Sequence, residues 1–231
     1  EQYVQGQTEG FEELKKSIKD FSPEKMEAIC GIEAETLKEV ARIYAKSEKS
    51  IIFWGMGVSQ HVHGTDNARC LIALALSTGQ VGREGTGLHP LRGQNNVQGA
   101  SDAGLIPWMY PDYLVVDGEV NQNSYEKFWN TKMDPKRGLT VVEIINAIHA
   151  DQIKSMYIMG ENPAMSDPDQ EHARKALAKL DHLVVQDIFL TETAWFADVV
   201  LPSSAHAEKT GTYTNTNRTV QMGRQVVPPP G

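Results

Sequence analysis

The sequence contains little cysteine, and its two cysteines stand far apart. Cys30 and Cys70 form no CxxC pair and have no third cysteine nearby. This spacing argues against a zinc or iron–sulfur site built by these residues alone. We expect both cysteines to be small apolar residues on helices, which is the commonest place for a free cysteine.

A long hydrophobic run and an excess of positive charge are also missing. Lys and Arg together number 22 against 30 Asp and Glu, which gives a net charge of −8. This balance argues against a nonspecific nucleic-acid or anionic-membrane surface. No apolar run approaches the roughly 20 residues that cross a bilayer, and no signal-like start is present. The sequence therefore predicts a cytoplasmic protein with no nucleic-acid partner and no direct membrane insertion.

Strand and helix patterns alternate along the chain. Apolar runs at 50–54, 156–159, 182–186 and 198–201 predict buried strands, the first ended by Gly55. Helical patterns occupy 9–20, 33–47, 66–77, 140–150 and a stretch that begins at 166–168. This order predicts an α/β fold with doubly wound, mostly parallel sheets and flanking helices. In such sheets ligands bind beyond the carboxyl ends of the strands.

Several predicted helices carry start and stop signals. Ser22 before Pro23 predicts a helix cap, and Gly31 predicts the end of that helix. Thr65 is the expected cap of the helix at 66–77, and residues 140–143 form a capping box. Between 33 and 47 apolar residues recur at helical spacing and predict one face packed on a core: Leu37, Val40, Ala41 and Tyr44.

Residues 100–139 are rich in proline and glycine and predict irregular structure that links two domains. We therefore expect a partial α/β domain at 1–94 and a second, dinucleotide-binding-like α/β domain at 95–201. Residues 202–231 are predicted to be a strand-rich, truncated segment of a further domain.

A polar, turn-rich stretch at residues 92–99 contains one guanidinium and four side-chain amides. The guanidinium of Arg92 matches a carboxylate or phosphate with two parallel hydrogen bonds. The amides can donate and accept hydrogen bonds; they belong to Gln94, Asn95, Asn96 and Gln98. An ordinary surface loop shows a similar composition, so the local sequence leaves both interpretations open.

Two further polar loops follow predicted strands. The first contains Gly160, Glu161, Asn162 and Pro163; the second contains Gln186, Asp187, Thr191 and Thr193. A carboxylate accepts two hydrogen bonds side by side, which suits the N1–H and N2–H₂ edge of guanine. A plain turn explains the first loop about as well, and a helix N-cap is an alternative role for Asp187.

The loop at 55–60 reads Gly-Met-Gly-Val-Ser-Gln. It departs from the dinucleotide fingerprint because Gln60 replaces the third glycine and no acidic residue follows at a second strand's end. An ordinary NAD site is therefore not expected. A tight strand-to-helix turn and a ligand contact through Met56 or Gln60 both fit the local sequence.

Taken together, residues 92–99, 55–60 and 78–82 resemble the catalytic (alpha) subunit of molybdenum- or tungsten-dependent formate dehydrogenase, in the molybdopterin oxidoreductase family. The resemblance continues through residues 160–163, 186–193 and 197–202, so it covers nearly the whole chain. The Arg-Gly-Gln-Asn-Asn form of residues 92–96 resembles formate dehydrogenase more than nitrate reductase.

The resemblance implies a cofactor, a substrate and roles for particular residues. It implies bis-molybdopterin guanine dinucleotide with Mo or W, with Met56 and Gln60 at the pterin. Arg92 and Gln94 are then the catalytic residues that hold formate. The loops at the guanine nucleotide end supply Gly160, Glu161, Asn162, Pro163, Gln186, Asp187, Thr191 and Thr193. Electron-transfer subunits are the implied protein partners.

The family's catalytic subunit is much longer than this chain, with an upstream iron–sulfur segment and a cysteine or selenocysteine that binds the metal. Neither Cys30 nor Cys70 lies in that context, so we expect no metal ligand here. We also expect the chain to be an internal fragment, inactive alone, with the iron–sulfur cluster outside it. Two alternatives stay open: another molybdopterin oxidoreductase, such as a nitrate reductase-like enzyme or the large subunit of NADH dehydrogenase, and a noncatalytic nucleotide-binding module.

Overall fold

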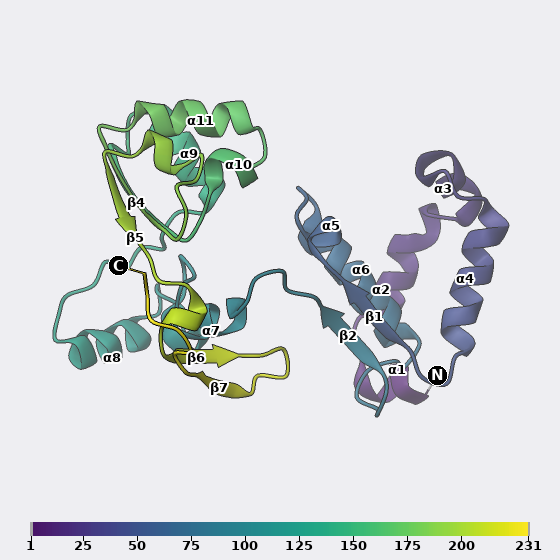
Figure 1. Cartoon of the computed structure of the whole chain (residues 1–231). Helices are drawn as coiled ribbons and strands as arrows, with labels where there is room; N and C mark the ends of the chain where they lie inside the picture. The colour runs from purple at the N-terminus through teal and green to yellow at the C-terminus, as the bar shows by residue number, and fades with distance from the viewer. Residues whose placement is uncertain (1, 231) are drawn as a thin grey trace. The chain divides into compact units, whose positions relative to one another are not determined.

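A computed structural model describes residues 2–230. The chain divides into two compact units, unit 1 at Glu1–Gly93 and unit 2 at Gln94–Gly231 (Figure 1). The boundary falls between Arg92 and Gln94, inside the polar stretch. The further domain at 202–231 stays a prediction.

Unit 1 begins with four helices: α1 (Gln2–Gln7), α2 (Phe11–Ser17), α3 (Pro23–Cys30) and α4 (Ala34–Lys46). The predicted cap of α3 is confirmed, because the Ser22 side chain accepts a hydrogen bond from the Lys25 backbone N–H at 3.4 Å. Gly31 ends the helix in the left-handed region, with φ +71°. Glycine adopts this conformation without steric cost.

The two strands of unit 1 are β1 (Ile51–Trp54) and β2 (Gly87–Pro90), which pair in parallel. The connection between them contains α5 (Met56–Ser59) and α6 (Gly64–Ser77). The prediction that Thr65 caps α6 is wrong, since Thr65 lies inside the helix and His63 is the capping position. Gly64 explains the earlier start: a Cβ there would collide with the Ser59 carbonyl, so the chain turns into the helix at this glycine.

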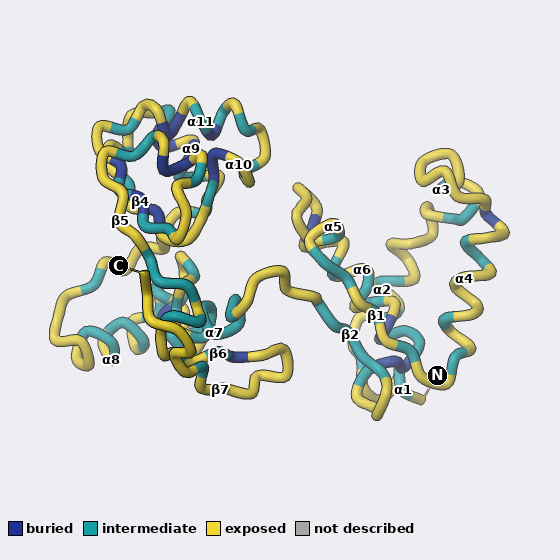
Figure 2. The backbone as a smooth tube through the Cα atoms, in the orientation of Figure 1, coloured by how far each residue is buried: buried dark blue, intermediate teal, exposed yellow. Residues whose placement is uncertain are grey.

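The apolar face predicted for α4 and the buried strand predicted at 50–54 are only partly realised (Figure 2). Val40 is 60% exposed and Phe53 is 58% exposed. A two-stranded sheet offers little surface to cover an apolar face. The predicted elements form, but the described residues of unit 1 leave these side chains in contact with solvent.

Unit 2 contains a three-stranded parallel sheet in the order β3 (Ser155–Met159), β4 (His182–Asp187) and β5 (Val199–Pro202). The helices α9 (Val141–His149), α10 (Pro163–Ser166) and α11 (Gln170–Lys179) flank it. The predicted α/β fold with parallel sheets and flanking helices is confirmed.

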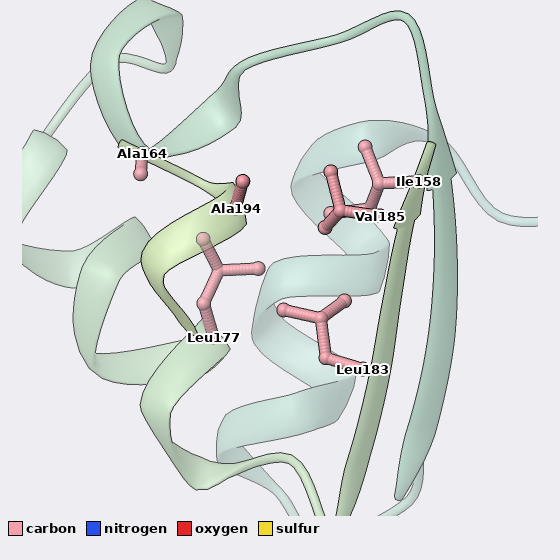
Figure 3. Packing of buried hydrophobic residues seen from close by; sticks show 6 residues of the cluster. All are labelled: Ile158, Ala164, Leu177, Leu183, Val185 and Ala194. Atoms are coloured by element: carbon pink, nitrogen blue, oxygen red, sulfur yellow. The ribbon is translucent and has the colours of Figure 1, made fainter. Parts of the chain in front are cut away.

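The core of unit 2 lies between this sheet and its helices. Figure 3 shows Ile158, Val185 and Leu183 pointing from the strands toward Leu177 and Ala194. Leu177 and Leu183 are each 1% exposed. A second cluster joins α9 to α11 through Ile145, Ile148 and Ala176. Burial of a leucine side chain contributes about 1.5–3 kcal/mol, so these contacts hold the sheet and helices together.

Helix ends in unit 2 follow the predicted signals with one exception. Thr140 and Glu143 form the expected capping box at the start of α9. The helix predicted from 166–168 begins later, at Gln170, where the Asp169 side chain accepts from the His172 backbone N–H at 3.3 Å. Asp169 has a φ of +50°, so the left-handed turn at this residue separates α10 from α11.

The prediction of irregular structure throughout 100–139 is wrong, because this stretch contains α8 (Glu119–Trp129). The rings of Tyr125 and Tyr110 stack with their centroids 4.6 Å apart. The ring of Trp129 contacts the Tyr110 ring edge-on, at 6.1 Å between centroids. The aromatic residues of this stretch therefore form a cluster in which Tyr125 and Trp129 of α8 pack against Tyr110. The chain also forms α7 (Val97–Asp102) and an antiparallel pair, β6 (Gly211–Thr214) with β7 (Val220–Gly223).

Two remaining predictions concern the positions of the cysteines and the length of the apolar segments. Cys30 and Cys70 both lie on helices, as predicted, and both are exposed. Among the described helices, none combines the length and hydropathy needed to cross a bilayer.

Candidate functional site

The carboxyl ends of β3 and β4 bring two of the predicted loops together. Met159 pairs with Gln186 at the ends of these strands. Gly160 then donates its backbone N–H to the Gln186 carbonyl at 2.9 Å, with a φ of +67°. The loops at 160–163 and 186–193 thus leave the sheet side by side.

A hydrogen-bonded cluster ties these two loops to each other. The Asn162 side chain donates to Glu192 at 2.7 Å and accepts from the Thr193 hydroxyl at 2.7 Å. Thr193 is completely buried, and its hydroxyl also accepts from the Ala164 backbone N–H at 3.0 Å. These contacts occupy Asn162 and Thr193, so both residues set the shape of the loops from within.

Glu192 belongs to this cluster and was not among the predicted site residues. Its pKa lies below the ordinary value of a glutamate, chiefly because the Asn162 amide donates to the carboxylate. Its position between Thr191 and Thr193, two predicted site residues, was the sequence signal that could have identified Glu192. The Thr191 hydroxyl accepts from the Ala194 backbone N–H at 3.3 Å and starts a 3-10 turn at Ala194–Phe196. Pro163, which is buried, begins α10 beside this turn.

Two carboxylates remain at the edge of the sheet. Glu161 is exposed, and Asp187 is half-buried at the end of β4. One oxygen of Asp187 accepts from the Ile188 backbone N–H at 2.6 Å, which leaves the second oxygen without a protein partner among residues 2–230. Gln186 beside it accepts from the Tyr157 hydroxyl.

Glu161 also contacts the polar stretch at 92–99. The Gln94 side-chain N–H group donates to the Glu161 carboxylate at 3.2 Å, although the two residues are 67 positions apart. Both residues belong to unit 2. One predicted substrate residue and one predicted cofactor residue are therefore neighbours.

Other amides of the polar stretch are engaged inside unit 2. Gln98 donates to Asp102 at 2.9 Å and to the Tyr113 hydroxyl at 2.9 Å. The hydrogen bond from the Gln98 amide is the main cause that holds the pKa of Asp102 below its ordinary value. Asp102 also pairs with Arg218 at 3.2 Å. Gln98 is thus a structural residue of α7, whereas Asn95 is exposed.

The remaining predicted residues lie in unit 1. Arg92 follows β2 on an exposed loop, and its guanidinium has no hydrogen bond or ion pair to the described residues. Met56 starts α5 and is 55% exposed, and Gln60 ends this helix by donating its backbone N–H to the Met56 carbonyl at 2.8 Å. All three side chains are accessible to a ligand.

A parallel sheet with flanking helices and polar loops at the carboxyl ends of its strands places unit 2 in the α/β class of folds. Comparison with known proteins narrows this class. The family model of molybdopterin oxidoreductases matches residues 13–231, and the chain belongs to this family.

Similar proteins include formate dehydrogenases. The chain is 51% identical over its whole length to the F420-dependent formate dehydrogenase subunit alpha of Methanocaldococcus jannaschii, and covers 34% of that protein. It is 39% identical to formate dehydrogenase H of Escherichia coli over 98% of the chain and 32% of that protein. The chain thus spans about a third of the length of these curated relatives.

A solved structure supports the fold. Acetylene hydratase from Pelobacter acetylenicus matches 99% of the chain and 34% of its own length, with a TM-score of 0.69 and 20% identity. At this identity the likeness concerns the fold alone.

Proposed function

We propose that this chain is part of the catalytic subunit of a molybdenum- or tungsten-dependent formate dehydrogenase, which oxidises formate to CO₂ and releases two electrons. The observation that carries the proposal is the 51% identity to a formate dehydrogenase alpha subunit over the full 230 aligned residues. The broader assignment to the molybdopterin oxidoreductases allows other substrates.

The residues at the ends of β3 and β4 fit the guanine end of a molybdopterin guanine dinucleotide. Glu161 and the free oxygen of Asp187 can accept hydrogen bonds from guanine N–H groups. Gly160 has open space where a Cβ would stand, so a ligand can approach its backbone closely. The cluster formed by Asn162, Glu192 and Thr193 holds both loops in place before a ligand arrives.

We assign the second dinucleotide of the bis-cofactor to unit 1. Gln60 offers an amide to a pterin edge, and Met56 offers an adaptable apolar side chain for packing against it. When bound, the molybdopterin group with Mo or W supplies the two-electron redox chemistry, while the protein supplies binding, orientation and electrostatics.

Formate is assigned to Arg92 and Gln94. The Arg92 guanidinium can hold the formate carboxylate with two parallel hydrogen bonds and fix its orientation, which lowers the entropic part of the barrier. Its charge stabilises the anion most strongly where water is excluded. Gln94, held by Glu161, adds a second polar contact. Carbon dioxide carries no charge, so it loses this attraction and leaves.

The proposal includes parts that lie outside these residues. An iron–sulfur cluster and electron-transfer subunits take the electrons onward, and the enzyme acts in the cytoplasm. Residues 1–231 by themselves are expected to oxidise no formate, because the family's cysteine or selenocysteine metal ligand is expected to lie outside them.

Substrate comparison tests the reaction. The purified enzyme that contains this chain is expected to reduce a viologen dye with formate. Nitrate should not reoxidise the reduced dye, and acetylene should give no hydrated product. Nitrate reduction without formate oxidation would assign the chain to another reaction of the family.

Cofactor retention tests the assignment of the nucleotide loops. Asp187→Asn and Glu161→Gln each replace one carboxylate acceptor oxygen with an N–H₂ donor and remove the charge, and each is expected to lower the molar content of metal and pterin severalfold. Asp181→Asn is the matched control, because Asp181 is exposed and precedes the other end of β4. Wild-type cofactor content in both loop variants would remove these residues from the site.

A further inference from the structure

Asn96 makes an unusual pair of contacts with a strand edge. Its side-chain N–H group donates to the Thr212 carbonyl at 3.2 Å, and its side-chain oxygen accepts from the Thr214 backbone N–H at 2.9 Å. Thr212 and Thr214 belong to β6, which pairs with β7 on its other side. The Asn96 amide therefore bonds to the free edge of β6 as a peptide group of a neighbouring strand would.

The local backbone is arranged around this contact. Asn96 has a φ of +64°, a conformation that asparagine tolerates better than most side chains. A Cβ at Gly99 would collide with the Asn96 side-chain oxygen. Gly99 lies inside α7, where glycine is less favourable than alanine by about 1 kcal/mol. The space that glycine leaves for Asn96 accounts for its presence there.

The contact joins distant parts of the chain at residues 92–96, which we call the substrate loop. Asn96 and Thr212 are 116 positions apart. Gln94 is separated from Asn96 only by Asn95, and Arg92 lies on the same loop. Gln94 is itself bonded to Glu161 at 3.2 Å. The loop is thus held at Asn96 by β6 and at Gln94 by the loop after β3.

We infer that Asn96 is a positioning residue for formate binding: its amide anchors the substrate loop to the edge of β6 and so fixes Gln94 where it contacts the anion. This inference rests on the proposed function. Without the anchor, the loop explores more conformations, and formate must restore the productive one at the cost of binding energy.

Kinetics of the cofactor-loaded enzyme test the inference. Asn96→Gly keeps the positive φ and removes both side-chain bonds, so it is expected to raise the formate KM about tenfold and to lower kcat, since a misplaced catalytic group slows the reaction. Gly99→Ala should act in the same direction by displacing the Asn96 side chain, although alanine favours the helix. Thr212→Val is the matched control, because only its backbone carbonyl takes part; its KM should stay within about twofold of wild type.

Two further readouts separate anchoring from general damage. Metal and pterin content should remain at the wild-type level in Asn96→Gly, since the cofactor loops keep their own contacts. The backbone N–H of Thr214 should exchange with solvent faster in this variant, because it loses its acceptor. If Asn96→Gly does not accumulate as soluble protein, Asn96→Asp replaces it in the test. This variant keeps the side-chain acceptor and loses the donor, so its formate KM is expected to lie between the wild-type value and the tenfold increase.

Arg92→Ala, measured alongside, distinguishes failure of the inference from failure of the proposed function. A raised formate KM in Arg92→Ala with a wild-type KM in both Asn96→Gly and Gly99→Ala would overturn the anchoring role alone. Unchanged exchange of the Thr214 N–H in Asn96→Gly would also overturn it. A wild-type KM in Arg92→Ala would instead contradict the proposed assignment of formate to this loop.

Discussion

The two units use the same strand–helix–strand plan and are stabilised in different ways. Unit 2 places Leu177 and Leu183, each 1% exposed, between its sheet and helices. Among the described residues of unit 1 the largest fully buried side chain is polar: Gln80, 1% exposed, accepts from the Ser50 backbone N–H at 3.0 Å and donates to the Ser47 carbonyl at 2.8 Å. An apolar sequence pattern therefore predicts the elements of both units, but a packed apolar core only where other elements cover the pattern.

The largest difference between the units is expected from core truncation. Leu177→Ala should lower the free energy of unfolding of unit 2 by about 2–5 kcal/mol, because it removes a buried side chain and leaves a cavity. Val40→Ala on α4 of unit 1 should change stability by less than about 0.5 kcal/mol, since that side chain is already exposed. Denaturant dependence of hydrogen exchange at the amides of β3 to β5 and of α4 measures both. Similar losses in the two variants would show that Val40 is covered.

The polar interior of unit 1 is the next test. Gln80→Ala should destabilise unit 1 by about 1–3 kcal/mol, because the Ser50 N–H and the Ser47 carbonyl lose their partner away from water. Arg83, which also donates to Gln80 at 3.2 Å, loses one contact. Gln5→Ala, on the exposed face of α1, is the control. Hydrogen exchange of the β1 amides reports the change, and equal behaviour of the two variants would refute a structural role for Gln80.

The loop cluster of unit 2 should make a smaller contribution. Thr193→Val removes the hydroxyl that accepts from the Ala164 N–H and donates to Asn162, and should cost about 1–2 kcal/mol. Thr193→Ser keeps the hydroxyl and should retain most of the stability. Thermal unfolding of the three proteins provides the comparison. A valine variant as stable as wild type would show that the hydrogen bonds of the Thr193 hydroxyl do not stabilise unit 2.

The smallest expected effect concerns pH. The Arg137 guanidinium and the Thr140 backbone N–H hold the pKa of Glu143 at about 2, below its ordinary 4.5. Because the folded-state pKa is lowered, this stabilisation is complete above about pH 4.5 and disappears as the pH falls toward 2. The difference in Tm between wild type and Glu143→Gln should therefore shrink over that range. A constant difference would show that the charge of Glu143 does not matter.

Local signals allowed much of the fold to be predicted from the sequence. The Ser22 cap, the capping box at Thr140 and the strand at 182–186 depend on neighbours within a few residues, and all three are confirmed. Exposure of Val40 and Phe53 depends on which other elements pack against them. The start of α6 depends on the collision that a side chain at Gly64 would cause, which the local sequence does not reveal.

The candidate site shows the same division. Strand order was sufficient to expect the loops at 160–163 and 186–193 at one edge of a sheet. The sequence did not reveal which polar groups bond to one another. Asn96 and Gln98 looked like their neighbours Gln94 and Asn95, yet they bond to β6 and to Asp102. Glu192 was overlooked because its partner, Asn162, is 30 positions away.

The most direct test of the account is the formate kcat/KM of Arg92→Ala, measured on enzyme with wild-type metal and pterin content. Loss of a guanidinium that holds a desolvated carboxylate should lower kcat/KM about a hundredfold. Arg92→Lys should recover only part of this loss, because lysine restores the charge and not the paired hydrogen bonds. A kcat/KM equal to that of wild type in Arg92→Ala would contradict the central claim that this loop holds formate.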